Sequence, residues 1–223
     1  MSEATKGISI RRYMTIASLI DVLRQKKLAL LNPDSWDDRN DRLFMQKYKD
    51  YKGAAGLYGM CAALRGETYH HWKIFGGGAS GACLVLDRKT LEIYFNELQK
   101  QRGKRVRYGE VSYLTLEKVK ALTPHHIDNL PFFKRYGFRA EREYRVIIET
   151  DSAQESAIFI DFPLEAIKAI RLNPWLYDSQ VTSLKDTIRD LPGCTRLKVM
   201  PSKLINSATW RAVADRMAEG NSA

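Results

Sequence analysis

The residues best suited to chemistry form one short run, Glu141-Arg142-Glu143-Tyr144-Arg145, which precedes the apolar triplet Val146-Ile147-Ile148. Residues two apart in a strand share a face, so Glu141, Glu143 and Arg145 are expected on one face at the start of a strand. In a cleft, one carboxylate could hydrogen-bond a sugar hydroxyl while the other orients a nucleophile. An ion-pair ladder on an edge strand also places Glu opposite Arg, and it is the alternative interpretation.

A second polar group is the loop from Pro33 to Asp41, which holds four aspartates and Trp36. Clustered aspartates can bind a hard cation, but Trp36 and Arg39 stand where an EF-hand needs ligands or glycine. Asp37 and Asp38 are also good residues for capping a helix. The histidine pairs lack cysteines or other ligands at zinc-binding spacing. Helix capping is therefore the favoured interpretation, and we predict no metal site.

Two further segments could contact a nucleotide. The run from Gly76 to Gly81 is glycine-rich, and glycine lets backbone amides approach phosphates. It lacks the Gly-Lys-Ser/Thr of a Walker A loop and is not a dinucleotide-binding fingerprint. Trp72, just before it, could stack on a base or belong to the core. Arg12 and Tyr13, near the end of the first expected strand, could meet a pyrophosphate or simply be strand-end charge.

The composition is that of a globular protein with a basic surface. The 223 residues carry a net charge of +10, which attracts nucleic acid, nucleotides or anionic surfaces. The densest basic cluster, Lys100 to Arg107, is read equally well as a helix end or as a phosphate-contacting patch. There is no apolar stretch of membrane-spanning length and no signal peptide. Three cysteines without CxxC spacing fit inert buried thiols in a reducing compartment, so we expect a cytoplasmic protein.

The pattern of apolar residues predicts a single α+β domain over residues 8–218, with flexible termini at 1–7 and 219–223. Strands and helices intermix without regular βαβ alternation, which favours mixed or antiparallel sheets flanked by helices over a doubly wound sheet. Strands are expected at 8–13, 28–31, 57–64, 82–86, 105–108, 110–114, 143–150, 157–162, 167–172 and 195–200. Helices are expected at 16–23, in a short segment after residue 41, and at 68–75, 91–98, 116–138 with breaks near two prolines, 181–191 and 208–217.

The order of these motifs resembles a bacterial protein family of unknown function. That family combines an early Lys-Tyr, a Pro followed by a loop with Phe or Trp, then Asn or Asp, then Asp-Pro, a Trp ahead of a glycine-led strand, and a late Glu-x-Glu-Tyr-Arg run. The resemblance covers about Arg11 to Pro174. One departure is that Arg39 stands where the family has a proline after the aspartate. The residues here that carry the resemblance are, in order, Arg12-Tyr13, Pro33, Trp36-Asp37-Asp38, His71-Trp72, Gly81 to Leu86, Val106 to Tyr108, Lys134, Glu141 to Arg145 and Ile170 to Pro174.

The layout is also similar to the ADP-ribosyltransferases, among them the DarT-type DNA-modifying toxins. This resemblance implies an ADP-ribosyltransferase-like fold with NAD as substrate. It implies that Glu143 binds the nicotinamide-ribose 2'-hydroxyl and stabilises an oxocarbenium-like transition state, while Glu141 orients the acceptor. Arg12 would meet the pyrophosphate, and Tyr13 or Trp72 would stack. The other side chains expected around NAD are Trp36, Ser80 and Arg145, the last mainly as a structural partner of the carboxylates.

One feature of that superfamily is missing, because Ala79-Ser80-Gly81 stands in place of a Ser-Thr-Ser strand. Three functions remain as hypotheses. The first is an NAD-dependent ADP-ribosyltransferase that modifies nucleic acid or protein, as a toxin or phage-defence effector with a protein partner. The second is a non-enzymatic, basic nucleic-acid-binding or interaction module. The third is a metal-dependent nuclease that uses Asp37, Asp38 and Asp41 together with Glu141 and Glu143.

Overall fold

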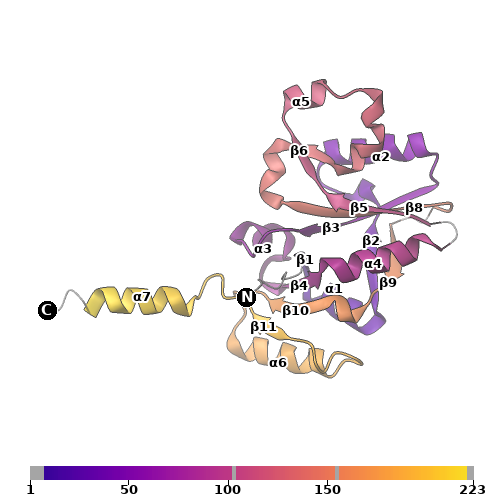
Figure 1. Cartoon of the computed structure of the whole chain (residues 1–223). Helices are drawn as coiled ribbons and strands as arrows, with labels where there is room; N and C mark the ends of the chain where they lie inside the picture. Colours follow the sequence, from indigo (N-terminus) through magenta and orange to yellow (C-terminus); the bar gives the residue numbers. More distant parts are fainter. Residues whose placement is uncertain (1–7, 102–103, 154–155, 220–223) are drawn as a thin grey trace, which may run out of the picture.

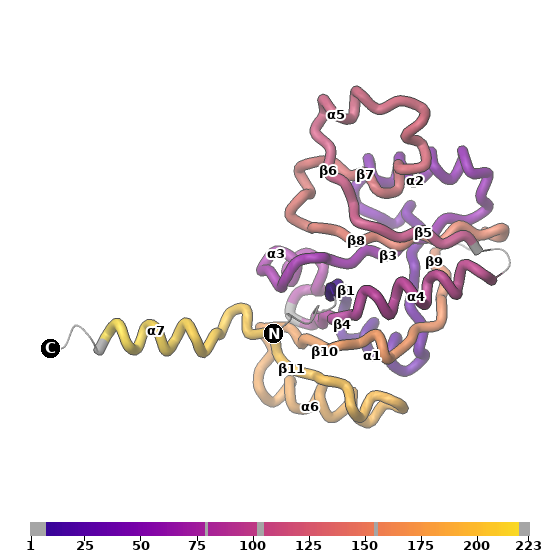
Figure 2. The backbone as a smooth tube through the Cα atoms, in the orientation of Figure 1, coloured from indigo at the N-terminus to yellow at the C-terminus, as the bar shows by residue number. Residues whose placement is uncertain are grey.

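The computed structural model describes residues 8–101, 104–153 and 156–219 (Figures 1 and 2). Within these ranges the chain forms a nine-stranded, mostly antiparallel sheet flanked by helices, and a small parallel pair, β6 and β7. The predicted α+β class with helices around mixed and antiparallel sheets is confirmed. The strands are β1 (Ser9–Thr15), β2 (Lys27–Leu31), β3 (Gly56–Ala63), β4 (Gly81–Asp87), β5 (Lys104–Glu110), β6 (Ser112–Leu114), β7 (Phe133–Arg135), β8 (Glu143–Thr150), β9 (Ala157–Asp161), β10 (Ile167–Leu172) and β11 (Val199–Pro201).

Helices lie on both sides of this framework (Figure 1). The α-helices are α1 (Ile16–Gln25), α2 (Arg39–Lys52), α3 (Tyr69–Phe75), α4 (Arg88–Gln99), α5 (Leu116–Lys120), α6 (Asp178–Arg189) and α7 (Ala208–Glu219). Short 3-10 segments are η1 (Pro33–Ser35), η2 (Gly78–Ser80), η3 (Pro124–Phe132), η4 (Tyr136–Glu141) and η5 (Leu164–Ala166). In the described part of the chain, no helix has the length and apolarity needed to cross a membrane.

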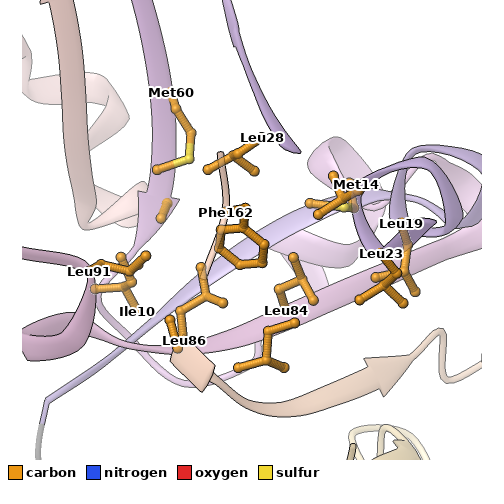
Figure 3. Close-up of a cluster of buried hydrophobic side chains, with 14 of the residues drawn as sticks. Ile10, Met14, Leu19, Leu23, Leu28, Met60, Leu84, Leu86, Leu91 and Phe162 are labelled. Carbon is orange, nitrogen blue, oxygen red and sulfur yellow. The ribbon is translucent and has the colours of Figure 1, made fainter. Parts of the chain in front are cut away.

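The main core lies between the sheet and the helices α1 and α4 (Figure 3). Thr15 caps α1 by accepting a hydrogen bond from the amide of Ser18 at 3.1 Å, as the sequence predicts. Leu19 and Leu23, one helical turn apart, then face the sheet and are fully buried. They belong to the same cluster as Leu84 on β4. This packing fixes β1 and β4 as a rigid floor.

The sheet opens between β1 and β3. β1 pairs with β4 from Ser9 to Thr15, but with β3 only at Arg11 opposite Ala63. β3 turns away and pairs along its whole length with β8. Strands that separate leave polar backbone groups that need other partners. The opening is therefore a natural place for side chains, and for a ligand, to enter the sheet.

β8 lies inside the sheet, between β3 and β5. The interpretation of Glu143 and Arg145 as an edge-strand ladder is therefore wrong. All eight residues of β8 are buried, as the continuous apolar triplet at its centre would require of a strand covered on both faces. Any charged side chain on this strand must find its partner in the interior.

Four segments differ from their prediction. Residues 116–138 do not form an interrupted helix. Pro124 begins a 3-10 segment, and Pro131 lies within it, because proline lacks the amide that an α-helix needs. β5 runs through Gly109 without a break. α2 begins earlier than expected, at Arg39, and has 14 residues. The last strand is only Val199–Pro201.

Parts of three predictions fall outside the described residues. These are the termini 1–7 and 220–223, and Arg102 and Gly103 of the basic cluster. Within the cluster, Arg105 pairs with Glu149 at 2.8 Å, and Arg107 donates to the main-chain oxygen of Asp128. At the other end of the chain, α7 projects away from the body (Figure 1).

Gly81 is required by close packing at the start of β4. A Cβ atom at this position would lie 1.7 Å from the main-chain oxygen of Gly76. We expect Gly81→Ala to lower the free energy of unfolding by about 3 kcal/mol, at the upper end of the cost of overpacking. Gly66→Ala is the matched control, because a Cβ at Gly66 meets no atom within 4 Å in the described structure. Equal midpoints for the two variants in urea denaturation would contradict this account.

Candidate active site

A cavity of about 640 Å³ occupies the opening between β1 and β3. Its floor is formed by Arg11 to Tyr13 of β1 and Cys61 to Ala63 of β3. One wall is α3, a second is the loop from Leu31 to Asp41, and a third is the segment from Lys134 to Glu143. The volume is within the range of pockets that hold a cofactor-sized molecule. Segments far apart in the sequence therefore meet around one space.

Arg145 lies directly behind this cavity and is completely buried. Its Nε donates to Glu143 Oε1 at 2.6 Å, and its two terminal nitrogens donate to the carboxylate of Asp41 at 2.8 and 2.7 Å. It also donates to the main-chain oxygen of Pro131 at 2.7 Å. The guanidinium carbon lies 4.8 Å from the ring centre of Trp36. Arg145 is thus a structural cation that fixes Glu143.

Lys134 joins the two candidate catalytic carboxylates. Its ammonium lies 2.7 Å from Glu141 Oε2 and 3.2 Å from Glu143 Oε2. Glu143 belongs to β8, as predicted. Glu141 ends η4 instead, because the intervening Arg142 has a left-handed backbone with φ of 46°. The two carboxylates therefore meet through Lys134 and not through a shared strand face.

The two carboxylates have different electrostatic surroundings. Burial opposes ionisation of Glu143, but the charges of Arg145 and Lys134 outweigh it and lower its pKa to about 2. Burial raises the pKa of Glu141 above its usual value, and Lys134 offsets this only in part. Glu143 is consequently a fixed anion, while Glu141 is the more easily protonated of the two carboxylates.

Two arginines on β1 present unused hydrogen-bond donors. Arg12 donates to the main-chain oxygen of Cys61 at 2.7 Å, across the gap between the strands. Arg11 donates to the main-chain oxygen of Arg65 at 3.0 Å. The Nε atoms of Arg11 and Arg12 are both buried and have no partner among the described residues. Buried donors are nearly always satisfied, so these atoms call for an acceptor from a ligand or water.

Aromatic rings form the adjoining part of the cavity. Tyr13 stacks on His71 with ring centres 5.4 Å apart and meets Trp72 edge to face at 5.2 Å. Trp72 is fully buried, donates to Glu67 at 3.2 Å and does not line the cavity. It supports Tyr13 from behind, and it is not placed to stack on a ligand in this structure.

Of the remaining residues expected around NAD, some line the cavity and others do not. Trp36 lines the cavity, whereas Ser80 is exposed, donates to the main-chain oxygen of Gly77 at 3.2 Å and lies outside the lining. Asp38 caps α2 by accepting from the amides of Asn40 and Asp41, so the capping interpretation holds for Asp38. In the described parts of the chain, no group of three His, Cys, Asp or Glu residues could hold a metal ion.

Sequence reasoning missed several residues of this site. Lys134 is one of them, because nothing in the sequence around it reveals that its partners are Glu141 and Glu143. His71 belongs to a pair of adjacent histidines without the spacing of a metal site, yet its Nε2 lies 3.0 Å from the main-chain oxygen of Glu141. Cys61 lines the cavity and is partly exposed, while Cys83 and Cys194 are buried as expected. Burial raises the pKa of the Cys61 thiol.

Comparison with solved structures finds chains that are similar to this one. The chain is similar to DarT of Thermus sp. 2.9 in complex with NAD⁺, with 13% identity, a TM-score of 0.45, and coverage of 89% of this chain and 96% of that one. DarT in complex with ADP-ribosylated single-stranded DNA gives 14% identity, a TM-score of 0.43, and coverage of 91% and 97%. No protein-family model matches, and no curated protein matches.

Proposed function

We propose that the protein is an NAD-dependent ADP-ribosyltransferase that uses the cavity between β1 and β3. The observation that carries the proposal is that arginine donors and carboxylates face each other across the cavity. On β1, Arg11 and Arg12 have buried Nε atoms without a described partner. On the facing segment, Glu141 and Glu143 are held together by Lys134. NAD matches both features. Its pyrophosphate is an acceptor for the two arginines, and its nicotinamide ribose, which becomes cationic in the reaction, suits the two carboxylates.

The arginines would bind the pyrophosphate. A guanidinium group binds phosphate strongly, because it is always charged at neutral pH and can donate two parallel N–H bonds to two phosphate oxygens. Arg12 is already held by Cys61, so its remaining donors are oriented before a ligand arrives. Tyr13, packed between His71 and Trp72, would support the nicotinamide or its ribose from the side.

The carboxylates would act on the ribose and on the acceptor. In the reaction the bond between ribose C1' and the nicotinamide nitrogen breaks, and its electron pair leaves with nicotinamide. Positive charge then develops on the ribose, where the fixed anion of Glu143 stabilises it. An acceptor oxygen or nitrogen forms the new bond to C1', and Glu141 takes the proton that this nucleophile loses.

The acceptor class that we propose is nucleic acid or protein, with a role as a toxin or phage-defence effector. The net charge of +10 supports a polyanionic acceptor. Exposed apolar side chains at the cavity, Ile74 on α3 and Phe138 on η4, offer a surface for the flat or apolar part of that acceptor.

Arg12→Met tests the assignment of the pyrophosphate. We expect the variant to weaken NAD binding about 10- to 100-fold, as the loss of a charge-assisted hydrogen bond of roughly 1.5–3 kcal/mol requires. Isothermal titration calorimetry with NAD measures the change. Arg24→Met on α1 is the control, because Arg24 is exposed and lies outside the cavity lining. Unchanged affinity in Arg12→Met would show that Arg12 does not bind NAD.

A further inference from the structure

The cavity carboxylates and their cations form a small, nearly closed charge group. Asp41, Glu141 and Glu143 face Lys134 and Arg145, so three negative charges meet two positive ones. One negative charge is left over. Arg145 is bonded to Asp41 and Glu143, which leaves Lys134 as the only cation that contacts Glu141 among the described salt bridges.

We propose that Lys134 is the positioning residue of this site: its ammonium holds Glu141 beside Glu143 and keeps Glu141 ionised, so that the leftover negative charge faces the cavity. This inference rests on the proposed function. It adds that Lys134 controls the position and charge of the two candidate catalytic carboxylates, Glu141 and Glu143. Lys134 itself need not touch the substrate, because its Nζ is already turned toward the carboxylates at 2.7 and 3.2 Å.

The packing around Lys134 supports a fixed orientation. Its side chain is only 11% exposed, and the ring centre of Phe138, which lines the cavity, lies 5.0 Å from Nζ. A buried ammonium held this closely is a stronger electrostatic influence than a surface lysine. Burial alone would lower the pKa of Lys134, but Glu143 and Glu141 raise it, so Lys134 stays charged.

Other titratable groups lie near Glu141, but none of them replaces Lys134 as the cation that pairs with it. His71 Nδ1 is 2.6 Å from Thr68 Oγ1, and Nε2 contacts the main chain of Glu141, which suits a neutral ring. Burial lowers the pKa of His71. The other titratable or charged side chains that line the same cavity are Arg11, Arg12, Tyr13, Asp37, Asp38, Cys61 and His70. From β6, the hydroxyl of Tyr113 accepts a hydrogen bond from the amide of Glu143 at 2.8 Å.

The direct test measures Glu141 in the protein without ligand. Glutamate labelled with ¹³C at the carboxyl carbon reports ionisation by NMR, and the signal that disappears in Glu141→Gln identifies Glu141. We expect Lys134→Gln, which keeps a hydrogen-bond donor but removes the charge, to move the titration of Glu141 upward by about 1–3 pH units, because an adjacent opposite charge favours the ionised form. Lys134→Arg should restore the wild-type titration.

Lys168→Gln is the matched control, since Lys168 pairs with Asp87 away from the cavity at 2.7 Å. It should leave the Glu141 titration unchanged. If Glu141 titrates at the same pH in the wild type and in Lys134→Gln, the proposal is overturned. If Lys134→Gln does not fold, the Lys134→Met and Lys134→Ala variants are titrated in the same way, and an unshifted Glu141 in either one overturns the proposal.

A kinetic measurement separates positioning from a merely structural role. In Lys134→Gln, the acidic limb of the kcat profile for NAD should move to higher pH, by the same interval as the titration, while KM changes only a few-fold. A lower yield of folded protein with an unmoved pH profile would contradict positioning. Absence of NAD turnover in the wild type would instead contradict the proposed function, and the ligand-free titration would still decide the role of Lys134.

Discussion

Arg145→Met should lower the free energy of unfolding by about 3–5 kcal/mol, because it removes the guanidinium that pairs with the buried carboxylates of both Asp41 and Glu143 and leaves Lys134 alone to offset them. Both carboxylates are at most 4% exposed, so water cannot replace the guanidinium. Arg145→Lys should recover only part of the loss, since one ammonium cannot reproduce the bidentate contact with Asp41. The measurement is the midpoint and slope of urea denaturation.

Lys100→Met is the control for this prediction. Lys100 pairs with Glu97 on the surface, where both side chains are more than 60% exposed. Such pairs contribute about 0–1 kcal/mol. If Arg145→Met and Lys100→Met unfolded at the same urea concentration, the buried charge group would not be what stabilises the start of β8.

Glu143→Gln should reduce the release of nicotinamide from NAD about 10²- to 10³-fold, the usual cost of removing one preorganised electrostatic contact with a transition state. Glutamine preserves the shape but not the charge that faces the ribose. KM should change much less than kcat, because the charge matters most when the ribose becomes cationic. The assay is the rate of nicotinamide release, measured at saturating NAD.

Glu97→Gln is the surface control and should keep full turnover. Comparison of Glu143→Gln with the wild type also distinguishes the proposed enzyme from the main alternative, a non-enzymatic nucleic-acid-binding module. That module would bind nucleic acid with a steep dependence on salt, equally well in Glu143→Gln and in the wild type, and neither protein would turn over NAD.

The elements that could be predicted are those decided by local residues. Thr15 and Asp87 each cap the helix that follows, and both helices carry their apolar residues on one face. The position of β8 could have been inferred from its central triplet, since three consecutive β-branched apolar residues suit a strand covered on both sides. Interpreting Glu143 and Arg145 as surface residues gave too much weight to their charge.

The rest of the site depends on contacts between distant parts of the chain. Asp41 and Arg145 are 104 residues apart, and their pairing follows from the way α2 packs against β8. Glu141 leaves the strand because Arg142 adopts a left-handed backbone, which is uncommon for a residue other than glycine. The burial of Trp72 is also tertiary, because a tryptophan on a two-turn helix can face either the core or a ligand.

The most direct test of the proposed activity is incubation of the protein with a cell lysate and NAD labelled on its adenylate phosphate. An ADP-ribosyltransferase of this kind should place label in the macromolecular fraction, in amounts that grow with time, and Glu143→Gln should slow the transfer about 10²- to 10³-fold. The labelled fraction would then be treated separately with nuclease and protease to identify the acceptor class. No label above the background without protein, at millimolar NAD and with the wild type correctly folded, would contradict the proposed function.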